Sequence, residues 1–244
     1  MVGADNRAVL RIHQLRFRWP RGQRDALDIP ELSVARGERV FVRGNSGSGK
    51  STLLGLIAGL MVPNTGSLEV LGQNLAGLGS AKRDQFRADH IGYIFQQFNL
   101  IPYLSVLDNI LLACRFSARR RQQALQASPS IQQAAVDLMA HLQLDPAEFR
   151  HRPARELSVG QQQRVAAVRA LIGAPELLIA DEPTSALDAD ARKGFIALLM
   201  KECEANGSTL LFVSHDPSLE GFFDRSIDLP QVNRADQSRE VVSC

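Results

Sequence analysis

A glycine-rich segment that ends in lysine and serine carries the clearest chemistry in this sequence. It reads Gly44-Asn45-Ser46-Gly47-Ser48-Gly49-Lys50-Ser51 and matches the pattern GxxxxGK[ST], which cradles phosphate groups. Glycines let the backbone curl so that several N–H groups point at one anion. A helix that begins near Gly49 would add about half a positive charge at its N-terminus. The alternative, an ordinary glycine-rich turn before a helix, does not explain a lysine and a serine at these offsets.

The side chains that close this segment suit the remaining parts of a bound triphosphate. Lys50 is long enough to reach the β- and γ-phosphates, and the hydroxyl of Ser51 can coordinate Mg²⁺. Thr52 can add a contact to the α-phosphate. We therefore expect ATP and Mg²⁺ as the ligands of this segment.

Two acidic residues, Asp181 and Glu182, end the apolar run at residues 176–180. A buried strand would deliver both carboxylates to the carboxyl edge of a sheet, where ligands bind in such folds. We expect Asp181 in the Mg²⁺ shell, directly or through water, and Glu182 as the base that polarises the attacking water. A pair of acids after a strand is, taken alone, more typical of a helix N-cap. It is the phosphate-binding pattern elsewhere in the chain that favours the catalytic interpretation.

Strands and helices must position these residues, and the hydrophobic pattern predicts both. Apolar and basic residues alternate over residues 8–19, which predicts a half-buried strand. Other strands are predicted at residues 27–34, 39–43, 67–71, 91–95, 176–180 and 209–213, and helices at residues 50–60 and 162–172. Strands that alternate with helices predict an α/β fold with a mostly parallel sheet.

The middle of the chain is predicted to be mainly helical. Within it, residues 119–130 combine three arginines, several glutamines and Ser-Pro-Ser, which is typical of a solvated connection. We expect one domain over residues 8–230, with residues 98–170 inserted as a helical subdomain. Residues 231–244 are expected to form a C-terminal tail.

The composition is that of an ordinary globular protein. The apolar fraction is 45%, the charged fraction is 22%, and the net charge of +2 is too small to indicate nucleic acid as a partner. Three cysteines lie far apart without metal-ligand spacing, which predicts reduced thiols in a cytoplasmic protein; they are Cys114, Cys203 and Cys244. The longest apolar run, residues 53–62, is too short to span a bilayer. If the protein works at a membrane, another chain must supply the spanning helices.

A second motif indicates a family. The segment Leu157-Ser158-Val159-Gly160-Gln161 precedes a long helical run and resembles the signature loop of the ABC ATPases, normally LSGGQ. The family order continues with Asp181–Glu182, with Ser185-Ala186-Leu187-Asp188 and with Ser214-His215-Asp216, so that the resemblance covers residues 9–229. It implies an ATP hydrolase with a P-loop NTPase core and a mostly parallel sheet. It also implies an N-terminal antiparallel β subdomain and an inserted α-helical signature subdomain.

The resemblance also implies roles for residues around the nucleotide. Gln96 would touch Mg²⁺ and water and sense a transmembrane partner, and the family pattern favours it over its neighbour Gln97. His215 would hold the γ-phosphate and position the water. Trp19 would stack on adenine, a contact typically worth about 1–3 kcal/mol per base, although Trp19 or Phe17 could instead belong to the core.

Four further residues would act across a dimer. Ser158 and Gly160 would contact the γ-phosphate held by the other copy, Gln161 beside them is also expected to bind the nucleotide, and Asp188 would cross the interface. A phosphate loop leaves the γ-phosphate open on one side, and the N-terminus of the signature helix also favours anions. Two copies in a two-fold, head-to-tail arrangement would therefore enclose each ATP. ATP would shift the population toward this closed dimer, and hydrolysis would release it.

The region from Gly72 to Pro102 resembles one bacterial branch of the family, which includes the ATPases of lipoprotein release, macrolide export and cell-division transporter-like complexes. Residues 98–102 are also similar to amino-acid importer ATPases, and a soluble non-transport ABC ATPase or a nucleotide-gated regulatory module are alternatives from other classes. The main interpretation implies a homodimer and a separate integral membrane subunit. It places the chain on the cytoplasmic face of the plasma, or bacterial inner, membrane. The face around residues 96–105 is the predicted docking surface for that subunit, because its apolar stretch at residues 98–104, with Phe98 and Tyr103, would otherwise be exposed to water.

Overall fold

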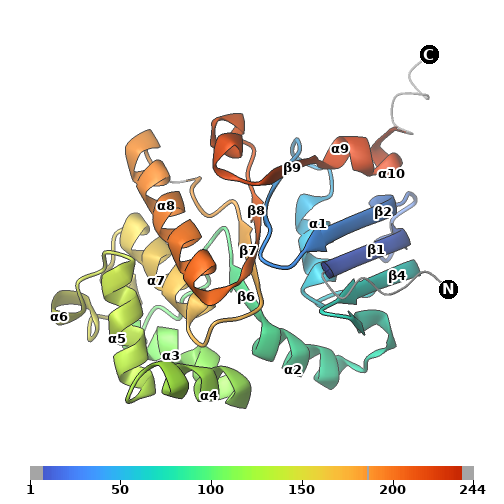
Figure 1. Cartoon of the computed structure of the whole chain (residues 1–244). Helices are drawn as coiled ribbons and strands as arrows, with labels where there is room; N and C mark the ends of the chain where they lie inside the picture. The colour runs from blue at the N-terminus through green and yellow to red at the C-terminus, as the bar shows by residue number, and fades with distance from the viewer. Residues whose placement is uncertain (1–7, 186, 238–244) are drawn as a thin grey trace. The chain divides into compact units, whose positions relative to one another are not determined.

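The computed structural model describes residues 8–185 and 187–237, and the chain falls into two units (Figure 1). One unit holds the residues up to Asp84 together with those from Leu211 onward, and the other holds Gln85–Leu210. The chain leaves the first unit within helix α2 (Ser80–His90) and returns to it within strand β8 (Thr209–Val213). The predicted single domain over residues 8–230, with its insertion at residues 98–170, stays a prediction.

The first unit contains an antiparallel sheet in the strand order β2-β1-β4-β5 (Figure 1). Its strands are β1 (Ala8–Phe17), β2 (Leu27–Ala35), β4 (Thr65–Val70) and β5 (Gln73–Asn74). In β1, buried and exposed residues alternate from Leu15 to Phe17, with Arg16 exposed, because alternate side chains face opposite sides of a strand. An irregularity in the pairing between His13 and Arg16 shifts this alternation, so that Ile12 and Leu15 are both buried. The expected N-terminal antiparallel β subdomain is thereby confirmed.

The first unit also contains the parallel strands around the glycine-rich segment. Strand β3 (Arg39–Arg43) pairs in parallel with β9 (Arg225–Asp228), and β8 lies next to β3. The rings of Phe41 and Phe212 stack in the core between these strands and neighbouring elements. Helix α1 (Lys50–Ile57) follows the glycine-rich segment. The remaining helical pieces are η1 (Leu75–Gly77), η3 (Pro217–Phe222), α9 (Leu229–Val232) and α10 (Arg234–Gln237).

The second unit combines two parallel strands with most of the helices (Figure 1). Strand β6 (Ile91–Ile94) pairs in parallel with β7 (Leu177–Asp181). The helices are α3 (Val106–Phe116), α4 (Ala118–Ala127), α5 (Ile131–His141), α6 (Pro146–Phe149), η2 (Ala154–Glu156), α7 (Val159–Leu171) and α8 (Ala189–Asn206). The expected α/β class is confirmed, and so are most of the predicted strands, with bounds that differ by a few residues.

The prediction of a solvated connection at residues 119–130 is wrong, because most of this stretch forms helix α4. Ser117 caps the helix by accepting a hydrogen bond from the backbone N–H of Arg120 at 3.0 Å. Arg120 and Ala124 are buried on one face of the helix. The other arginines of the run are exposed, which is why the sequence looks uniformly solvated.

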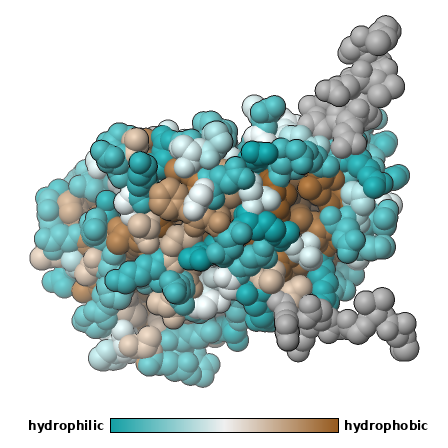
Figure 2. Space-filling model, turned by 45° about the horizontal axis from the view of Figure 1, so that its top comes forward, coloured by the Kyte–Doolittle hydropathy of each residue, from teal (hydrophilic) through white to brown (hydrophobic). Residues whose placement is uncertain are grey.

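Hydrophobic and hydrophilic residues are mixed on the surface of the protein. In the view of Figure 2, hydrophobic residues occur in small groups among hydrophilic ones. Within residues 8–185 and 187–237, no helix is long and apolar enough to cross a bilayer. The thiols of Cys114 and Cys203 are buried and in no disulfide, and Cys244 lies outside the described residues.

One buried side chain, that of Asn109 on α3, holds the loop that precedes this helix. Its Oδ1 accepts a hydrogen bond from the backbone N–H of Ile101 at 2.8 Å. Its Nδ2 donates to the carbonyl oxygens of Ile101 at 3.1 Å and Ser105 at 3.0 Å. Because these loop groups lie where water is scarce, the amide of Asn109 substitutes for the missing solvent.

We expect Asn109→Ala to lower the free energy of unfolding by about 2–4 kcal/mol, because it leaves several buried backbone groups without a partner. Equilibrium urea unfolding followed by circular dichroism measures the loss. The control is Gln126→Ala, an exposed position on α4, which should change stability by less than about 0.5 kcal/mol. Equal, small effects of the two substitutions would show that Asn109 does not hold the loop.

Candidate functional site

The glycine-rich segment forms a turn between the buried strand β3 and the first turn of α1. Gly47 has a φ of 80° and Gly49, the N-cap of α1, has a φ of 99°, a region that favours glycine. Gly49 has no side chain to cap α1, so the first backbone N–H groups of the helix are available to an anion. Gly44 is needed for space, since a Cβ there would lie 2.5 Å from Oγ of Ser48.

Lys50 folds back into this turn. Its Nζ donates hydrogen bonds to the carbonyl oxygens of Gly44 at 2.6 Å and Asn45 at 3.0 Å. The ammonium is therefore held at the mouth of the turn, where the phosphates of a nucleotide would lie. Oγ of Ser48 is buried and makes no hydrogen bond to any residue that the structure describes. The turn thus offers glycine backbone, a helix N-terminus, an ammonium and a buried hydroxyl, a donor set that fits a polyphosphate.

The other predicted phosphate residues lie around the same turn. Asn45, Ser46 and Gly47 are exposed at its tip, and Ser51 is exposed on the first turn of α1. Thr52, in contrast, is buried against the core. Ser51 is exposed, and its contact with a metal ion stays a prediction.

Asn233 supports the turn from far along the chain, and sequence reasoning missed it. It lies in the segment predicted as a C-terminal tail, and its side chain is only 2% exposed. Its Nδ2 donates to the carbonyl oxygens of Ser48 at 3.2 Å and Ala26 at 3.1 Å. Its Oδ1 accepts from the backbone N–H of Asp28 at 2.8 Å. Asn233 thereby fastens the glycine-rich turn to strand β2. No local pattern marks such a residue, because its partners are backbone atoms far away in sequence.

Two other predicted residues belong to the first unit. His215 is exposed directly after β8 and the buried Ser214, beyond the carboxyl end of that strand. Trp19 follows the end of β1 and is 49% exposed, with its ring edge against Phe17 at 5.3 Å between centroids. Phe17 is buried, so of the two aromatic residues Trp19 is the one that a base can reach.

The predicted carboxylates lie at the carboxyl end of β7 in the second unit. Asp181 is the last residue of the strand, and Glu182 follows it with a φ of 46°, which is uncommon for a residue other than glycine. Such strained backbone concentrates at functional sites, where the surrounding structure imposes it. Both side chains are half-buried.

Tyr93 on β6 is a partner of Asp181 that the sequence did not indicate. Its hydroxyl donates a hydrogen bond to the Asp181 carboxylate. Burial, and then the charge of Asp181, raise the pKa of Tyr93 well above its usual value. The phenol therefore stays protonated beside the carboxylate.

Gln96 lies just beyond β6, where it is exposed and where the backbone turns sharply. The next residues include Phe98 with a φ of 58° and Asn99 with a φ of 48°. Gln96 follows β6, and Asp181 is the last residue of the adjacent parallel strand β7. Adjacent parallel strands bring their carboxyl ends to the same edge of a sheet.

The signature segment begins helix α7. Oγ of Ser158 accepts from the backbone N–H of Gln161 at 3.3 Å, and Oε1 of Gln161 accepts from the backbone N–H of Ser158 at 2.8 Å. This reciprocal capping box explains why serine and glutamine are spaced by three residues here. Gly160 is half-buried beside them and Val159 is exposed. The contact of these residues with a phosphate stays a prediction.

Asp188 has a local role as well. Its Oδ1 accepts from the backbone N–H of Ala191 at 2.8 Å, so it is the N-cap of α8. Its side chain is exposed, and its predicted position in a dimer interface stays a prediction. Ala186, the second residue of this motif, lies outside the described residues.

The chain is similar to proteins of known family. The family model described as ABC transporter matches residues 27–185. The lipoprotein-releasing system ATP-binding protein LolD of Chromohalobacter salexigens is 37% identical over 230 residues, with 93% of each chain covered. The macrolide export ATP-binding/permease protein MacB of Escherichia coli is 39% identical over 206 residues. That match covers 84% of this chain but only 30% of MacB.

Solved structures are similar too. The ATP-binding cassette MJ0796, in a dimeric post-hydrolysis state bound to ADP and Pi, superposes with a TM-score of 0.76 at 33% sequence identity. The superposition covers 90% of this chain and 93% of that one. A second dimeric structure of MJ0796, a bacterial ABC transporter cassette, gives the same values.

We expect Asn233→Ala to weaken ATP binding, although this side chain is bonded to backbone atoms behind the turn and is not a predicted ligand. The substitution leaves the Ser48 carbonyl without its donor and should cost about 1–3 kcal/mol of stability. Titration with a fluorescent ATP analogue, together with thermal unfolding, measures both effects. Gln231→Ala, at an exposed position two residues away, is the matched control. Wild-type affinity in Asn233→Ala would mean that the turn keeps its shape without this contact.

Proposed function

Because the chain belongs to the ABC transporter family and is an ABC-type ATPase, we propose that it is the ATP-hydrolysing subunit of a membrane complex. In this complex, closure of an ATP-bound homodimer drives a separate integral membrane subunit. The observation that carries the proposal is the glycine-rich turn, in which the ammonium of Lys50 is held at the N-terminus of α1.

Residues of both units have roles in hydrolysis under this proposal. ATP supplies the phosphoanhydride bond, and Mg²⁺ supplies positive charge beside it. Ser51, Gln96 and Asp181 offer hydroxyl, amide and carboxylate oxygens, the donors that Mg²⁺ prefers. Glu182, which follows β7 with a left-handed backbone, accepts the proton of the attacking water.

Three further residues complete the site. His215 holds the terminal phosphate and orients the water from the end of β8. Trp19 stacks on the base. Lys50 and the N–H groups of the turn neutralise the charge that develops during transfer, which is the main way that proteins accelerate this reaction.

A homodimer follows from the position of the signature segment. The capping box of Ser158 and Gln161 leaves Gly160 and the first turn of α7 at an exposed helix N-terminus, which favours an anion. In the proposed dimer this end of one copy covers the phosphates held by the turn of the other, with Asp188 at the interface. The similar MJ0796 cassettes are dimeric, which supports a dimer of this chain.

The relatives favour the branch of lipoprotein release and macrolide export. The match to LolD covers 93% of its length, and LolD is an ATP-binding protein of a lipoprotein-releasing system. MacB combines ATP-binding and permease parts in one chain, of which this chain spans about a third. We therefore propose export, or a lipoprotein-related process, over amino-acid import or a soluble non-transport role. The chain would be peripheral on the cytoplasmic face of the bacterial inner membrane.

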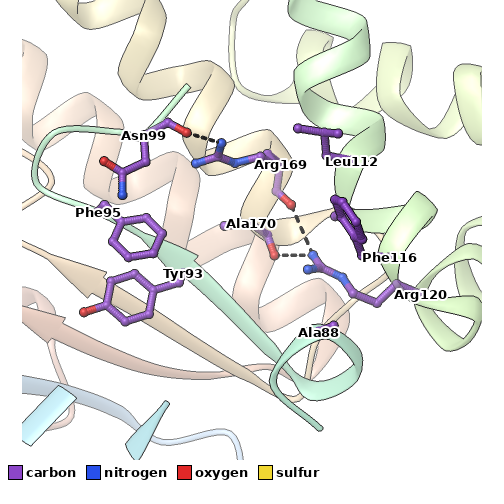
Figure 3. A pocket seen from close by; sticks show the side chains of 10 residues that line it. Ala88, Tyr93, Phe95, Asn99, Leu112, Phe116, Arg120, Arg169 and Ala170 are labelled. Atoms are coloured by element: carbon purple, nitrogen blue, oxygen red, sulfur yellow. Dashed lines mark hydrogen bonds between the residues drawn. The ribbon is translucent and has the colours of Figure 1, made fainter. Parts of the chain in front are cut away.

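The structure changes the predicted docking surface. Within the predicted stretch at residues 98–104, Phe98 is only 8% exposed and therefore cannot be a docking contact, whereas Tyr103 is 73% exposed. A pocket of about 260 Å³ lies in the second unit, lined mainly by apolar and aromatic side chains (Figure 3). Phe116, at the end of α3, lines it and is 71% exposed. We propose that a helix of the membrane subunit places an apolar side chain in this pocket, which is hereafter the α3 pocket.

We expect Glu182→Gln to bind ATP normally but to hydrolyse it about 10²–10⁴-fold more slowly, because the amide cannot accept the proton of water. The closed dimer should then accumulate. Size-exclusion chromatography with Mg-ATP measures dimerisation, and phosphate release measures turnover. The wild-type protein with ADP should elute mainly as a monomer, because only the γ-phosphate bridges the two copies.

Lys50→Ala is the control in that experiment. It loses the cationic partner of the triphosphate and should neither bind ATP nor dimerise. A monomeric Glu182→Gln at saturating ATP would count against the sandwich dimer. Rapid hydrolysis by the same variant would transfer the role of base to another residue, with His215 as the first candidate.

We expect Phe116→Asp to abolish membrane association while leaving ATP binding unchanged, because it puts a carboxylate at the rim of the α3 pocket. Co-sedimentation with inner-membrane vesicles from the native bacterium measures association. Leu125→Asp is the control, since Leu125 is an exposed apolar residue on α4 that does not line the pocket. Normal sedimentation of Phe116→Asp would place the docking surface elsewhere.

A further inference from the structure

One arginine of the signature helix binds the loop that carries Gln96. The guanidinium of Arg169, near the end of α7, donates a hydrogen bond to the carbonyl oxygen of Asn99 at 2.7 Å (Figure 3). It also donates to the carbonyl oxygen of Phe98. Burial lowers the pKa of Arg169, but an arginine remains charged at any physiological pH. The charged guanidinium of Arg169 thus donates to two consecutive carbonyls of the loop. Hydrogen bonds from ionised groups are stronger than neutral ones, so these two contacts bind the loop firmly to α7.

The backbone that Arg169 binds is strained. Phe98 and Asn99 have φ values of 58° and 48°, so two consecutive residues other than glycine adopt the left-handed region. The turn is tight, with the backbone N–H of Phe98 donating to the carbonyl of Phe95 at 2.9 Å. Conformations of this kind persist only where the surroundings impose them. The fork of Arg169 is the contact that faces both carbonyls.

A second arginine fixes the part of α7 that carries Arg169. Arg120, on α4, is buried and donates to the carbonyl oxygens of Ile172 at 2.8 Å and of Arg169 itself at 3.2 Å. It also donates to the carbonyl of Ala170. These are the carbonyls that a helix end leaves without partners, so Arg120 closes the C-terminus of α7. Gly173 permits this approach, because a Cβ at that position would lie 2.6 Å from Cβ of Arg120.

Both arginines line the α3 pocket, together with Asn99 (Figure 3). In Figure 3 the side chain of Arg169 runs along one wall toward Asn99, and Arg120 reaches the carbonyls of Arg169 and Ala170 from the other side. A side chain that entered this pocket would therefore touch the groups that join α4, α7 and the loop after β6.

We propose that Arg169 is a positioning residue, which holds the turn at Phe98–Asn99 in its left-handed form and thereby sets the place of Gln96. The inference rests on the proposed function, because it is there that Gln96 acts on Mg²⁺ and water. It goes beyond that function by naming the contact through which the signature helix and the α3 pocket act on Gln96. Lysine could not replace this arginine, since an ammonium has no planar fork to bind two carbonyls at once.

Hydrogen–deuterium exchange of the nucleotide-free protein tests the structural part. In Arg169→Met, the amides of the peptide that spans residues 95–101 should exchange about tenfold faster, because the turn opens locally. Arg164→Met is the matched control. Arg164 lies on the same helix and donates to the carbonyl of Leu142 at 2.6 Å, but it does not touch the loop. It should lower the melting temperature without changing exchange at residues 95–101. Arg169→Lys serves as the second variant if the methionine variant does not fold. It should show an intermediate increase in the exchange rate at residues 95–101.

A double-mutant cycle tests the link to Gln96. If Arg169 acts through Gln96, Arg169→Met and Gln96→Ala should each reduce kcat, and the double variant should be no slower than the slower single variant. Multiplied effects, or unchanged exchange at residues 95–101 in Arg169→Met, would overturn the inference. Normal turnover in Gln96→Ala would instead overturn the proposed role of Gln96, while the exchange experiment would still decide whether Arg169 holds the turn.

Discussion

The charge of a triphosphate imposes the main constraint on this protein. Burying several negative charges is costly unless hydrogen-bond donors surround them. If the loop had to rearrange to supply these donors, the rearrangement would use up part of the binding free energy, so the donors must already be in place. The turn between β3 and α1 meets this constraint with backbone N–H groups, the N-terminus of α1 and the ammonium of Lys50. The buried strand β3 and the contacts of Asn233 keep this turn in shape.

The second unit meets a different requirement, which is to hold carboxylate and amide groups steady beside water. Tyr93 binds Asp181, and the arginine fork of Arg169 binds the loop after Gln96. Glu182, Phe98 and Asn99 all have left-handed backbone. Strain at three positions beside proposed catalytic groups indicates that packing around them, and not local preference, determines their conformation.

The sequence was sufficient to predict the parts whose signals are local. The phosphate-binding turn, β3 and β8 could be placed because a fixed motif or a short apolar run defines each of them. Helix α4 was missed, because its buried face depends on Arg120 reaching carbonyls some fifty residues away on α7. Asn233 and Tyr93 were missed for the same reason: their partners are distant in sequence, and an isolated asparagine or tyrosine carries no pattern. The contact of Ser158 with Gln161 shows the opposite case, since a family motif there coincides with an ordinary capping box.

The contact of Asn233 with the phosphate-binding turn has a consequence for how the protein is made. The two residues that it joins, Ser48 and Asn233, are separated by 185 positions. At synthesis rates of about 5–20 residues per second, Asn233 is added about 10–40 s after Ser48. The whole second unit, Gln85–Leu210, emerges from the ribosome in that interval. The helical unit can therefore fold during translation while the nucleotide turn is still unsupported. Nucleotide binding would then be among the last properties that the nascent chain acquires.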